Sequence, residues 1–350
     1  MRDPKKPHGV GTARIAAVAT ALPEHRLTQE ALREVCCRIF GRTPHLAKFL
    51  GIFEHAGVKE RYFSFPVDYY LNGHTFTERN HDYIAKAREL GAHAVRGALD
   101  GAGCTAQEID QFYFVTTTGL STPSIDAILA EELGFRRDVQ RNPLFGLGCA
   151  GGAAALARAA QGLTGKALIL SVELCGQTFL NRDLSVSNMV GAALFGDGAA
   201  AVILDGGGKG PEVFAWSSEL FQGTRDVMGW EFMSEGFKLV LSQSVPSAIV
   251  AHVAPAIKRF LGRQGLTLAA IRHFLLHPGG AKVLSAYQSS LGADLGWTER
   301  SLERVGNLSS ASVFFILHDL LEAKTARAGD IALLASVGPG FAMEAVLLRW

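Results

Sequence analysis

Residues 145–161 read FGLGCAGGAAALARAAQ, and this stretch decides the fold around it. Glycine and alanine flank Cys149, and the residues that follow are strong helix formers. We therefore predict a sharp turn at Cys149 that opens a helix over residues 150–163. Unpaired N–H groups and the dipole at a helix N-terminus favour a thiolate, and small neighbours would let a substrate carbonyl approach the sulfur. Most cysteines are simply buried, and we give Cys36, Cys37 and Cys104 that interpretation.

Strand-like and helical apolar segments alternate on both sides of this stretch. We expect strands at residues 13–20, 112–116 and 167–172, and helices at 91–101 and 123–133, the latter with Pro123 in its first turn. Such alternation is typical of an α/β protein whose sheet is covered on both faces.

One pattern occurs twice. Residues 194–204 read LFGDGAAAVIL and residues 337–348 read VGPGFAMEAVLL, each a glycine turn followed by an apolar strand. We infer two similar halves, residues 13–205 and 206–350, which meet at the linker-like DGGGKGP of residues 205–211. Residues 1–12 are interpreted as a flexible tail. Because glycine turns before strands are common in α/β folds, the repeat alone does not prove duplication.

The composition excludes several classes. The chain has 350 residues, 48% of them hydrophobic, and a net charge of +1, which argues against nucleic acid or an anionic membrane as partner. Five cysteines without a signal peptide favour the reducing cytoplasm over a disulfide framework. No CxxC or HExxH motif points to a metal, and no apolar run reaches the ~18 residues that a membrane span needs.

A nucleophilic cysteine needs a basic partner, and His277 is the best candidate. It ends an apolar strand and is followed by Pro-Gly-Gly, and active-site residues favour such strand ends. By contrast, His273 is expected at a strand edge, and His318 is expected inside a helix with a structural role.

Asn307 precedes the apolar stretch VFFILHDLL. Taken alone, it reads as a helix N-cap. Its place in the second half, opposite Cys149, favours a functional role instead, because an amide N–H beside an imidazole could stabilise an enolate or oxyanion.

Five ordered blocks resemble the type III polyketide synthases, relatives of chalcone synthase, over nearly the whole chain. They are GLGCAGGAAALARA (146–159), LFGDGAAA (194–201), LLHPGG (275–280), GNLSSASVFFIL (306–317) and GPGFAMEAVLL (338–348). The HPGG block is unlike the ketoacyl-carrier-protein synthases III, which typically carry Asn two residues after the histidine.

The resemblance implies a thiolase-like, duplicated five-layer αβαβα fold and a homodimer. Cys149 matches the acylated nucleophile, and His277 and Asn307 match the pair that binds the thioester carbonyl and promotes malonyl decarboxylation. Phe195 matches an aromatic residue that helps the carboxylate leave as CO2, because an apolar ring disfavours its charge; ordinary core packing is the alternative. The implied substrates are acyl-coenzyme A and malonyl-coenzyme A, with no metal or organic cofactor.

The resemblance also supplies pocket residues. Its initiation cavity matches Thr117, Thr118 and Ser309, and its acyl pocket matches Cys175, Thr178, Met228, Trp230 and Leu239. Departures from the plant enzymes at Cys175, Trp230 and Leu239, together with Thr122 in place of a partner-reaching methionine, favour an aliphatic starter and an alkylpyrone or alkylresorcinol product. Lys59 and Arg61 match a basic segment at the coenzyme A tunnel mouth, although a solvated charge pair is equally open for Lys59; a lysine used by plant enzymes aligns with His55.

Three alternatives stay open. The chain could be a ketoacyl-carrier-protein synthase III-like enzyme that performs one condensation, or a chalcone synthase-like enzyme with an aromatic or malonyl starter. It could also be a catalytically silent subunit of a heterodimer, which the intact set of Cys149, His277 and Asn307 argues against.

Overall fold

The computed structural model describes residues 13–41 and 46–350, without the side chains of 46–49, so the tail predicted at residues 1–12 lies outside the described residues. Its main sheet has nine strands. In spatial order they are β11 (His273–Leu276), β12 (Ile331–Gly338), β13 (Ala342–Arg349), β8 (Glu212–Leu220), β1 (Arg14–Ala21), β7 (Asp197–Asp205), β6 (Lys166–Leu174), β4 (Gln111–Val115) and β5 (Gln140–Leu144).

The sheet consists of two half-sheets with the same topology. In the first, β1 and β7 are antiparallel, β7 and β6 are antiparallel, and β6 and β4 are parallel. In the second, β8, β13, β12 and β11 repeat this order and these directions. Among the described residues, the half-sheets are joined at Arg14, which pairs with Glu212, and by backbone hydrogen bonds on either side of this pair. The repeated sequence pattern corresponds to β7 and β13, which occupy equivalent places.

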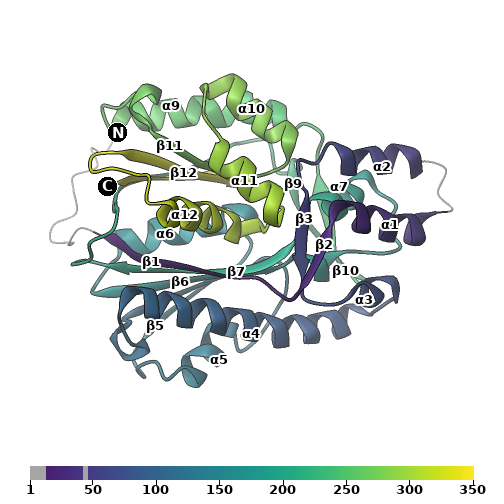
Figure 1. The fold of residues 1–350 in the computed structure, drawn as a ribbon, viewed down its shortest axis with the longest axis horizontal. Helices are drawn as coiled ribbons and strands as arrows, with labels where there is room; N and C mark the ends of the chain where they lie inside the picture. Colours follow the sequence, from purple (N-terminus) through teal and green to yellow (C-terminus); the bar gives the residue numbers. More distant parts are fainter. Residues whose placement is uncertain (1–12, 42–45) are drawn as a thin grey trace.

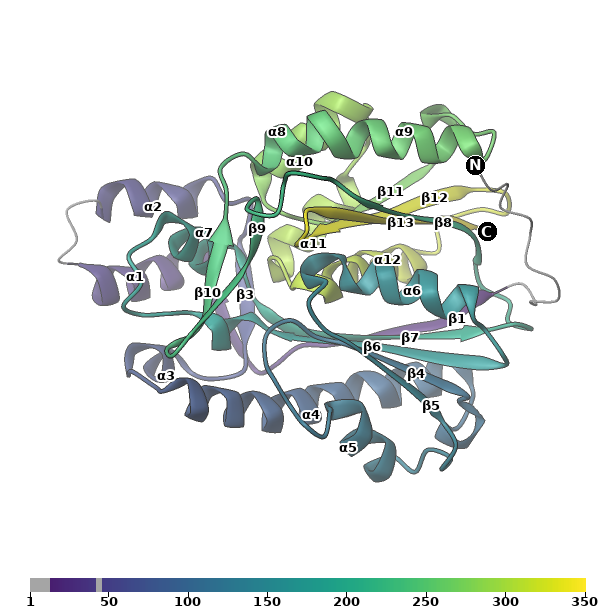
Figure 2. The ribbon, with the colours of Figure 1, turned by 180° about the vertical axis from the view of Figure 1, so that it is seen from behind.

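Helices cover both half-sheets and fill the space between them, which gives the five layers of a thiolase-like fold (Figures 1 and 2). Two helices lie between the half-sheets: α6 (Gly151–Gln161) and α12 (Ser312–Ala323). The outer layers are α4 (Phe76–Ala102) with α5 (Ile125–Glu132), and α9 (Ala254–Arg263) with α10 (Ala281–Leu291).

The remaining elements gather largely at one end of the layered core (Figure 1). Two short antiparallel pairs lie there: β2 (His25–Thr28) with β3 (Glu60–Phe63), and the hairpin of β9 (Met228–Met233) and β10 (Gly236–Leu241). The other helices are α1 (Gln29–Phe40), α2 (Leu46–Glu54), α3 (Val67–Leu71), α7 (Val186–Leu194), α8 (Val245–Ala248) and α11 (Gly296–Val305). Within the described chain, no helix has both the length and the apolarity needed to cross a membrane.

Two predicted helix boundaries are wrong. The helix expected at residues 91–101 is the second part of α4, which begins at Phe76 because Thr75 and Glu78 form a reciprocal capping box. Pro123 is not in the first turn of α5. Ser124 is the extended N-cap of that helix, so the proline precedes it.

Candidate active site

Cys149 lies where the sequence predicts, in a turn that opens a helix. Residues Gly148–Ala150 form one 3-10 turn, and α6 follows directly. The backbone carbonyl of Cys149 accepts a hydrogen bond of 2.6 Å from Ser336 Oγ, and its Sγ lies 3.5 Å from Ser309 Oγ. Both serines belong to the second half, so the nucleophile sits at the contact between the halves.

The glycines after Cys149 make room for protein and not for substrate, which corrects the sequence interpretation. A Cβ on Gly152 would lie 2.2 Å from the Ser310 carbonyl oxygen, and one on Gly151 would lie 2.6 Å from Val115 Cγ1. A Cβ on Gly148 would lie 2.4 Å from Pro339 Cδ. The small residues therefore let the backbones of the two halves approach each other closely.

Asn307 lies two residues before the equivalent turn of the second half. A 3-10 turn over Ser309–Ala311 leads into α12, as the Cys149 turn leads into α6. The N-cap interpretation of Asn307 is wrong, because the N-caps of this turn and of α12 are Leu308 and Ala311. Asn307 Oδ1 instead accepts from the Ser309 N–H at 2.8 Å, which fixes the side chain and leaves its NH2 group as a donor.

Backbone hydrogen bonds fix Phe195 beside Asn307. The two residues form an isolated parallel bridge, in which Asn307 N donates to Leu194 O at 2.8 Å and Gly196 N donates to Asn307 O at 3.1 Å. These bonds fix the position of Phe195, in the first half, relative to Asn307, in the second.

His277 directly follows β11, and its N–H donates to Ala335 O at 2.9 Å. Within the described chain, its Nδ1 is buried without a hydrogen-bond partner. As predicted, His273 lies on the edge strand of the sheet, where its Nε2 is 3.3 Å from Asp330 Oδ2. The prediction for His318 is also confirmed in place, since it lies within α12.

Burial makes the neutral forms of the catalytic pair favourable. It raises the pKa of the Cys149 thiol to about 12, which the hydrogen bond to Ser309 opposes, and lowers the pKa of His277 to about 3. The thiolate expected from the helix N-terminus is therefore opposed by desolvation. In the free enzyme we therefore expect a neutral thiol and a neutral imidazole in the same cavity.

A buried carboxyl of β6 connects the first half to the Ser309–Ala311 turn of the second half. Glu173 Oε2 accepts from Thr117 N at 3.0 Å and from Thr118 Oγ1 at 2.9 Å, and its Oε1 accepts from Ser310 Oγ. Burial raises its pKa to about 7. Sequence reasoning missed Glu173, although a single charged residue inside the apolar run ALILSVEL of residues 167–174 was the available signal.

The candidate catalytic residues line one cavity with an empty volume of about 690 Å³. Six of the eight predicted pocket residues also line it: Thr117, Cys175, Met228, Trp230, Leu239 and Ser309. Thr118 does not, because its hydroxyl donates to Glu173 and accepts from Leu174 N. Thr178 does not either; its hydroxyl donates to Cys175 O, and it faces a neighbouring cavity.

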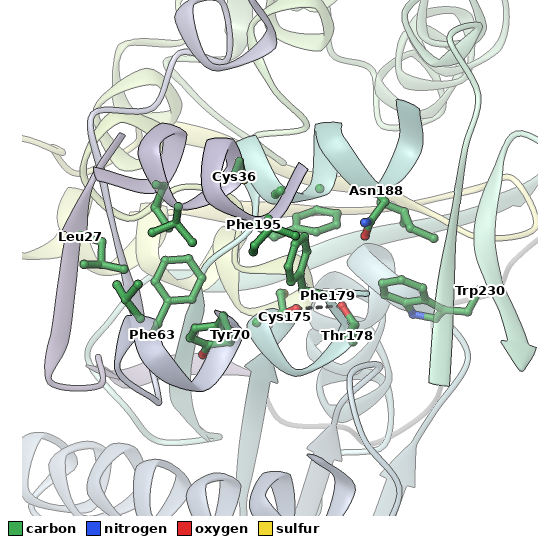
Figure 3. Close-up of a pocket in the computed structure, with 18 residues that line it drawn as sticks. Leu27, Cys36, Phe63, Tyr70, Cys175, Thr178, Phe179, Asn188, Phe195 and Trp230 are labelled. Atoms are coloured by element: carbon green, nitrogen blue, oxygen red, sulfur yellow. Dashed lines mark hydrogen bonds between the residues drawn. The ribbon is translucent and has the colours of Figure 1, made fainter. Parts of the chain in front are cut away.

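That neighbouring cavity has an empty volume of about 640 Å³ and a largely apolar wall (Figure 3). Cys175, Phe195, Trp230 and Leu239 line both cavities, so they form the partition between them. Figure 3 shows Trp230 on the hairpin side and Leu27, Cys36 and Phe63 on the far side.

The assignment of Arg61 to the tunnel mouth is wrong, because this side chain is fully buried. Its guanidinium donates to Ala192 O, Phe195 O and Gln29 Oε1 at 2.6–3.0 Å, so it holds the segment around Phe195 in place. Lys59 is exposed, and its Nζ lies 2.8 Å from Glu303 Oε2. This is a solvated charge pair, one of the two interpretations that the sequence allowed for Lys59.

A surface cleft at the start of α10 offers a lysine near the catalytic cavity, in place of Lys59 and Arg61. His55 and Lys282 line this cleft together with Glu54. The adjacent Gly279 and Val283 line the catalytic cavity, so α10 connects the two. Lys282 was missed; its place five residues after His277 was the available signal. Among the described residues, no cluster of three or more His, Cys, Asp or Glu could hold a metal ion.

Comparison with known proteins agrees with this geometry. The family model "Chalcone and stilbene synthases, N-terminal domain" matches residues 4–208, and that of the 3-oxoacyl-[acyl-carrier-protein] synthase III C terminal matches residues 261–350. The chain is 41% identical to a 1,3,6,8-tetrahydroxynaphthalene synthase of Streptomyces peucetius subsp. caesius, over 96% of this chain and 93% of that protein. It is 34% identical to a putative chalcone synthase of Bacillus subtilis, over 96% and 98%. The crystal structure of the tetrahydroxynaphthalene synthase of Streptomyces coelicolor A3(2), a bacterial type III polyketide synthase, superposes with a TM-score of 0.93 at 30% identity, covering 96% of this chain and 99% of the other.

Proposed function

Because the chain belongs to the type III polyketide synthases, acyltransferases that condense malonyl-coenzyme A, we propose that its starter is an aliphatic acyl-coenzyme A. The extended chain then cyclises to an alkylpyrone or alkylresorcinol. The observation that carries this proposal is the apolar cavity that shares a wall with the catalytic cavity.

The shape and chemistry of that cavity suit a hydrocarbon tail. Leu27, Leu32, Val35, Ile39 and Phe63 line its far side. Each CH2 group that leaves water for such a wall gains about 0.8 kcal/mol. An aliphatic starter therefore gains binding energy there with each carbon that fits.

In the loading step, neutral His277 takes the Sγ proton as the sulfur of Cys149 attacks the starter thioester. The NH2 group of Asn307 stabilises the developing oxyanion. When the tetrahedral intermediate collapses, coenzyme A leaves as a thiol with the proton from the imidazolium, and the acyl group stays on Cys149.

In the extension step, His277 and Asn307 donate hydrogen bonds to the malonyl thioester carbonyl. Beside the apolar ring of Phe195 the carboxylate is poorly solvated, and the C–C bond breaks to give CO2 and an enolate. The enolate carbon attacks the acyl carbonyl and displaces the Cys149 sulfur, which takes up a proton. The longer thioester returns to Cys149 for the next round. We propose that no metal or organic cofactor takes part.

We further propose that coenzyme A reaches the site along α10 and that two copies of the chain associate. At the cleft, the Lys282 ammonium offers a positive charge to its phosphates, and His55 and Ser285 offer polar side chains. Leu120, Phe145 and Phe232 are exposed apolar side chains, with Phe145 and Phe232 ring centroids 6.4 Å apart, and they supply an apolar surface for a second copy.

The starter is tested with Cys175→Phe and Leu239→Phe, which add bulk to the partition between the cavities. Product masses from acyl-coenzyme A starters of increasing length should show a shift to shorter chains. Leu184→Phe, at an exposed position, is the matched control. An unchanged chain-length profile in both partition variants would contradict the aliphatic proposal.

The 41% identity to a tetrahydroxynaphthalene synthase supports a second candidate, an aromatic product made from malonyl-coenzyme A alone. Such a product has no alkyl tail and would leave the apolar cavity without a use. Incubation with malonyl-coenzyme A alone distinguishes the two, since rapid turnover without any acyl starter favours the second. A strict requirement for carrier-protein thioesters would instead favour a synthase III-like enzyme.

A further inference from the structure

Two of the four partition residues, Trp230 and Leu239, belong to a hairpin that stands apart from the main sheet. β9 and β10 pair only with each other, with Trp230 opposite Leu239 and Met228 opposite Leu241. All four side chains line the catalytic cavity, and Trp230 and Leu239 also line the apolar one. The position of the hairpin therefore sets the width of the passage between them.

The turn of this hairpin is held by the first turns of α4. Arg79 donates through Nη2 to the Glu235 carbonyl in the hairpin turn and through Nη1 to His74 O at 3.1 Å. One helical turn away from Arg79, Phe76 packs on Phe237 with ring centroids 5.5 Å apart. Figure 2 shows the hairpin reaching toward the beginning of α4.

The sequence of the turn matches this contact. Gly236 has φ +127°, which favours glycine, and a Cβ there would lie 2.6 Å from Arg79 Nη2. Only a residue without a side chain lets the guanidinium reach the neighbouring carbonyl in this way.

A second bond holds the catalytic end of the hairpin. Trp230 Nε1 donates to Thr117 Oγ1 at 3.2 Å, and the Trp230 ring lies 6.0 Å from Phe237. Phe237 is only 3% exposed and packs against both Phe76 and Trp230, so a shift of the hairpin turn would also move Trp230. The Thr117 bond fixes the indole, and the Arg79 bond fixes the strand that carries it.

We propose that Arg79 is a positioning residue that sets starter chain length by clamping the β9–β10 hairpin against α4. It touches no substrate and acts through Trp230 and Leu239. This inference rests on the proposed aliphatic starter.

The test compares Arg79→Ala with Arg88→Ala, a control on the same helix whose exposed guanidinium pairs with Glu132. Arg79→Ala should raise KM for the preferred starter about tenfold, as expected for the loss of a charged hydrogen bond, and broaden the chain-length profile. Decarboxylation of malonyl-coenzyme A should stay unchanged. Arg79→Lys, which keeps one donor, should restore most of the profile.

Hydrogen exchange gives a readout that does not depend on turnover. In Arg79→Ala the amides of β9 and β10 should lose protection while those of β6 and β7 keep theirs. If Arg79→Ala does not fold, Gly236→Ala tests the same contact from the other side and should shift the profile alike. Wild-type protection of the hairpin together with a wild-type profile overturns the clamp. If the unmodified enzyme extends no aliphatic starter, the proposed function fails, and hydrogen exchange still decides whether Arg79 holds the hairpin.

Discussion

The two helices between the half-sheets begin with the same kind of turn but differ in side-chain size, since α6 consists mostly of small residues and α12 mostly of large ones. Both α6 and α12 follow a 3-10 turn whose first residue has a left-handed backbone, Gly148 at φ +50° and Ser309 at φ +48°. α6 reads GGAAALARAAQ, whereas α12 reads SVFFILHDLLEA. Large side chains on one helix thus fill the space that small ones leave on the other. The two halves thus share a backbone framework, whereas their sequences differ so that each turn carries different chemical groups.

The largest expected effect on activity distinguishes Cys149 from Ser310, which occupies the same second position in the other 3-10 turn. Cys149→Ala should lower chain extension by more than about 1,000-fold, because no nucleophile remains to hold the chain. Ser310→Ala removes the hydrogen bonds to Glu173 and Ser171 but no nucleophile, so this variant should still be acylated. Intact-protein mass spectrometry with an acyl-coenzyme A detects the acyl group. Chain extension by Cys149→Ala would refute the mechanism.

The next largest expected effect is on stability and tests how closely α6 approaches the Ser309–Ala311 turn. Gly152→Ala places a Cβ 2.2 Å from the Ser310 carbonyl oxygen, and we expect it to lower the free energy of unfolding by ~3 kcal/mol or more. Gly162→Ala, at the end of the same helix, meets nothing closer than 3.6 Å and should change it by less than ~0.5 kcal/mol. Denaturant unfolding measures the free energy of unfolding of both variants. Equal losses of stability would mean that any alanine in this helix has the same effect and that the close contact with Ser310 is not the cause.

A pH dependence should follow from Glu173, the carboxyl that bonds to both halves. Its pKa is about 7 in the fold against an ordinary 4.5, so the protonated acid stabilises the fold below pH 4.5 and this contribution is lost as pH rises to 7. The shift corresponds to ~3 kcal/mol. Glu173→Gln should therefore gain stability over the wild type between pH 4.5 and 8. Parallel pH profiles of the unfolding free energy would contradict this.

The smallest effect concerns the left-handed serine. Ser309→Ala and Ser309→Gly both lose the hydroxyl that lies 3.5 Å from Cys149 Sγ, so both should slow loading by a few-fold. They should differ in stability by only ~1 kcal/mol, because glycine relieves the backbone strain and alanine keeps it. Thermal unfolding compares them. Wild-type loading rates in both variants would show that Ser309 is retained for another reason.

Local sequence signals predicted much of this molecule. The turn at Cys149, the strand that ends at His277 and the repeated strands β7 and β13 follow from apolar periodicity and glycine placement, which act over a few residues. The contact between halves did not follow: the glycines of α6 looked like room for substrate because Ser310 is far away in the sequence. Likewise, the VKERY segment could not reveal that Arg61 is buried against Ala192 and Phe195, since burial is decided by the tertiary fold.

The hairpin shows the same limit. Nothing in residues 228–241 marks them as a partition between cavities, and Arg79 is an ordinary residue in the early turns of a helix. Their relation depends on packing between segments more than a hundred residues apart. Family resemblance supplied Trp230 and Leu239 as pocket residues, but not the group that holds them.

The order of the strands along the chain sets the order in which the site is completed during synthesis. The whole first half-sheet and Cys149 are synthesised by residue 205. Ser309 and Asn307 are made later, and β13, which must insert between β12 and β8, later still. A nascent chain that ends before them therefore carries its sulfur without the base, the amide or the second inner helix. We expect acyl transfer only after β13 has been made, so that an interrupted synthesis leaves an inactive thiol and not a half-active enzyme.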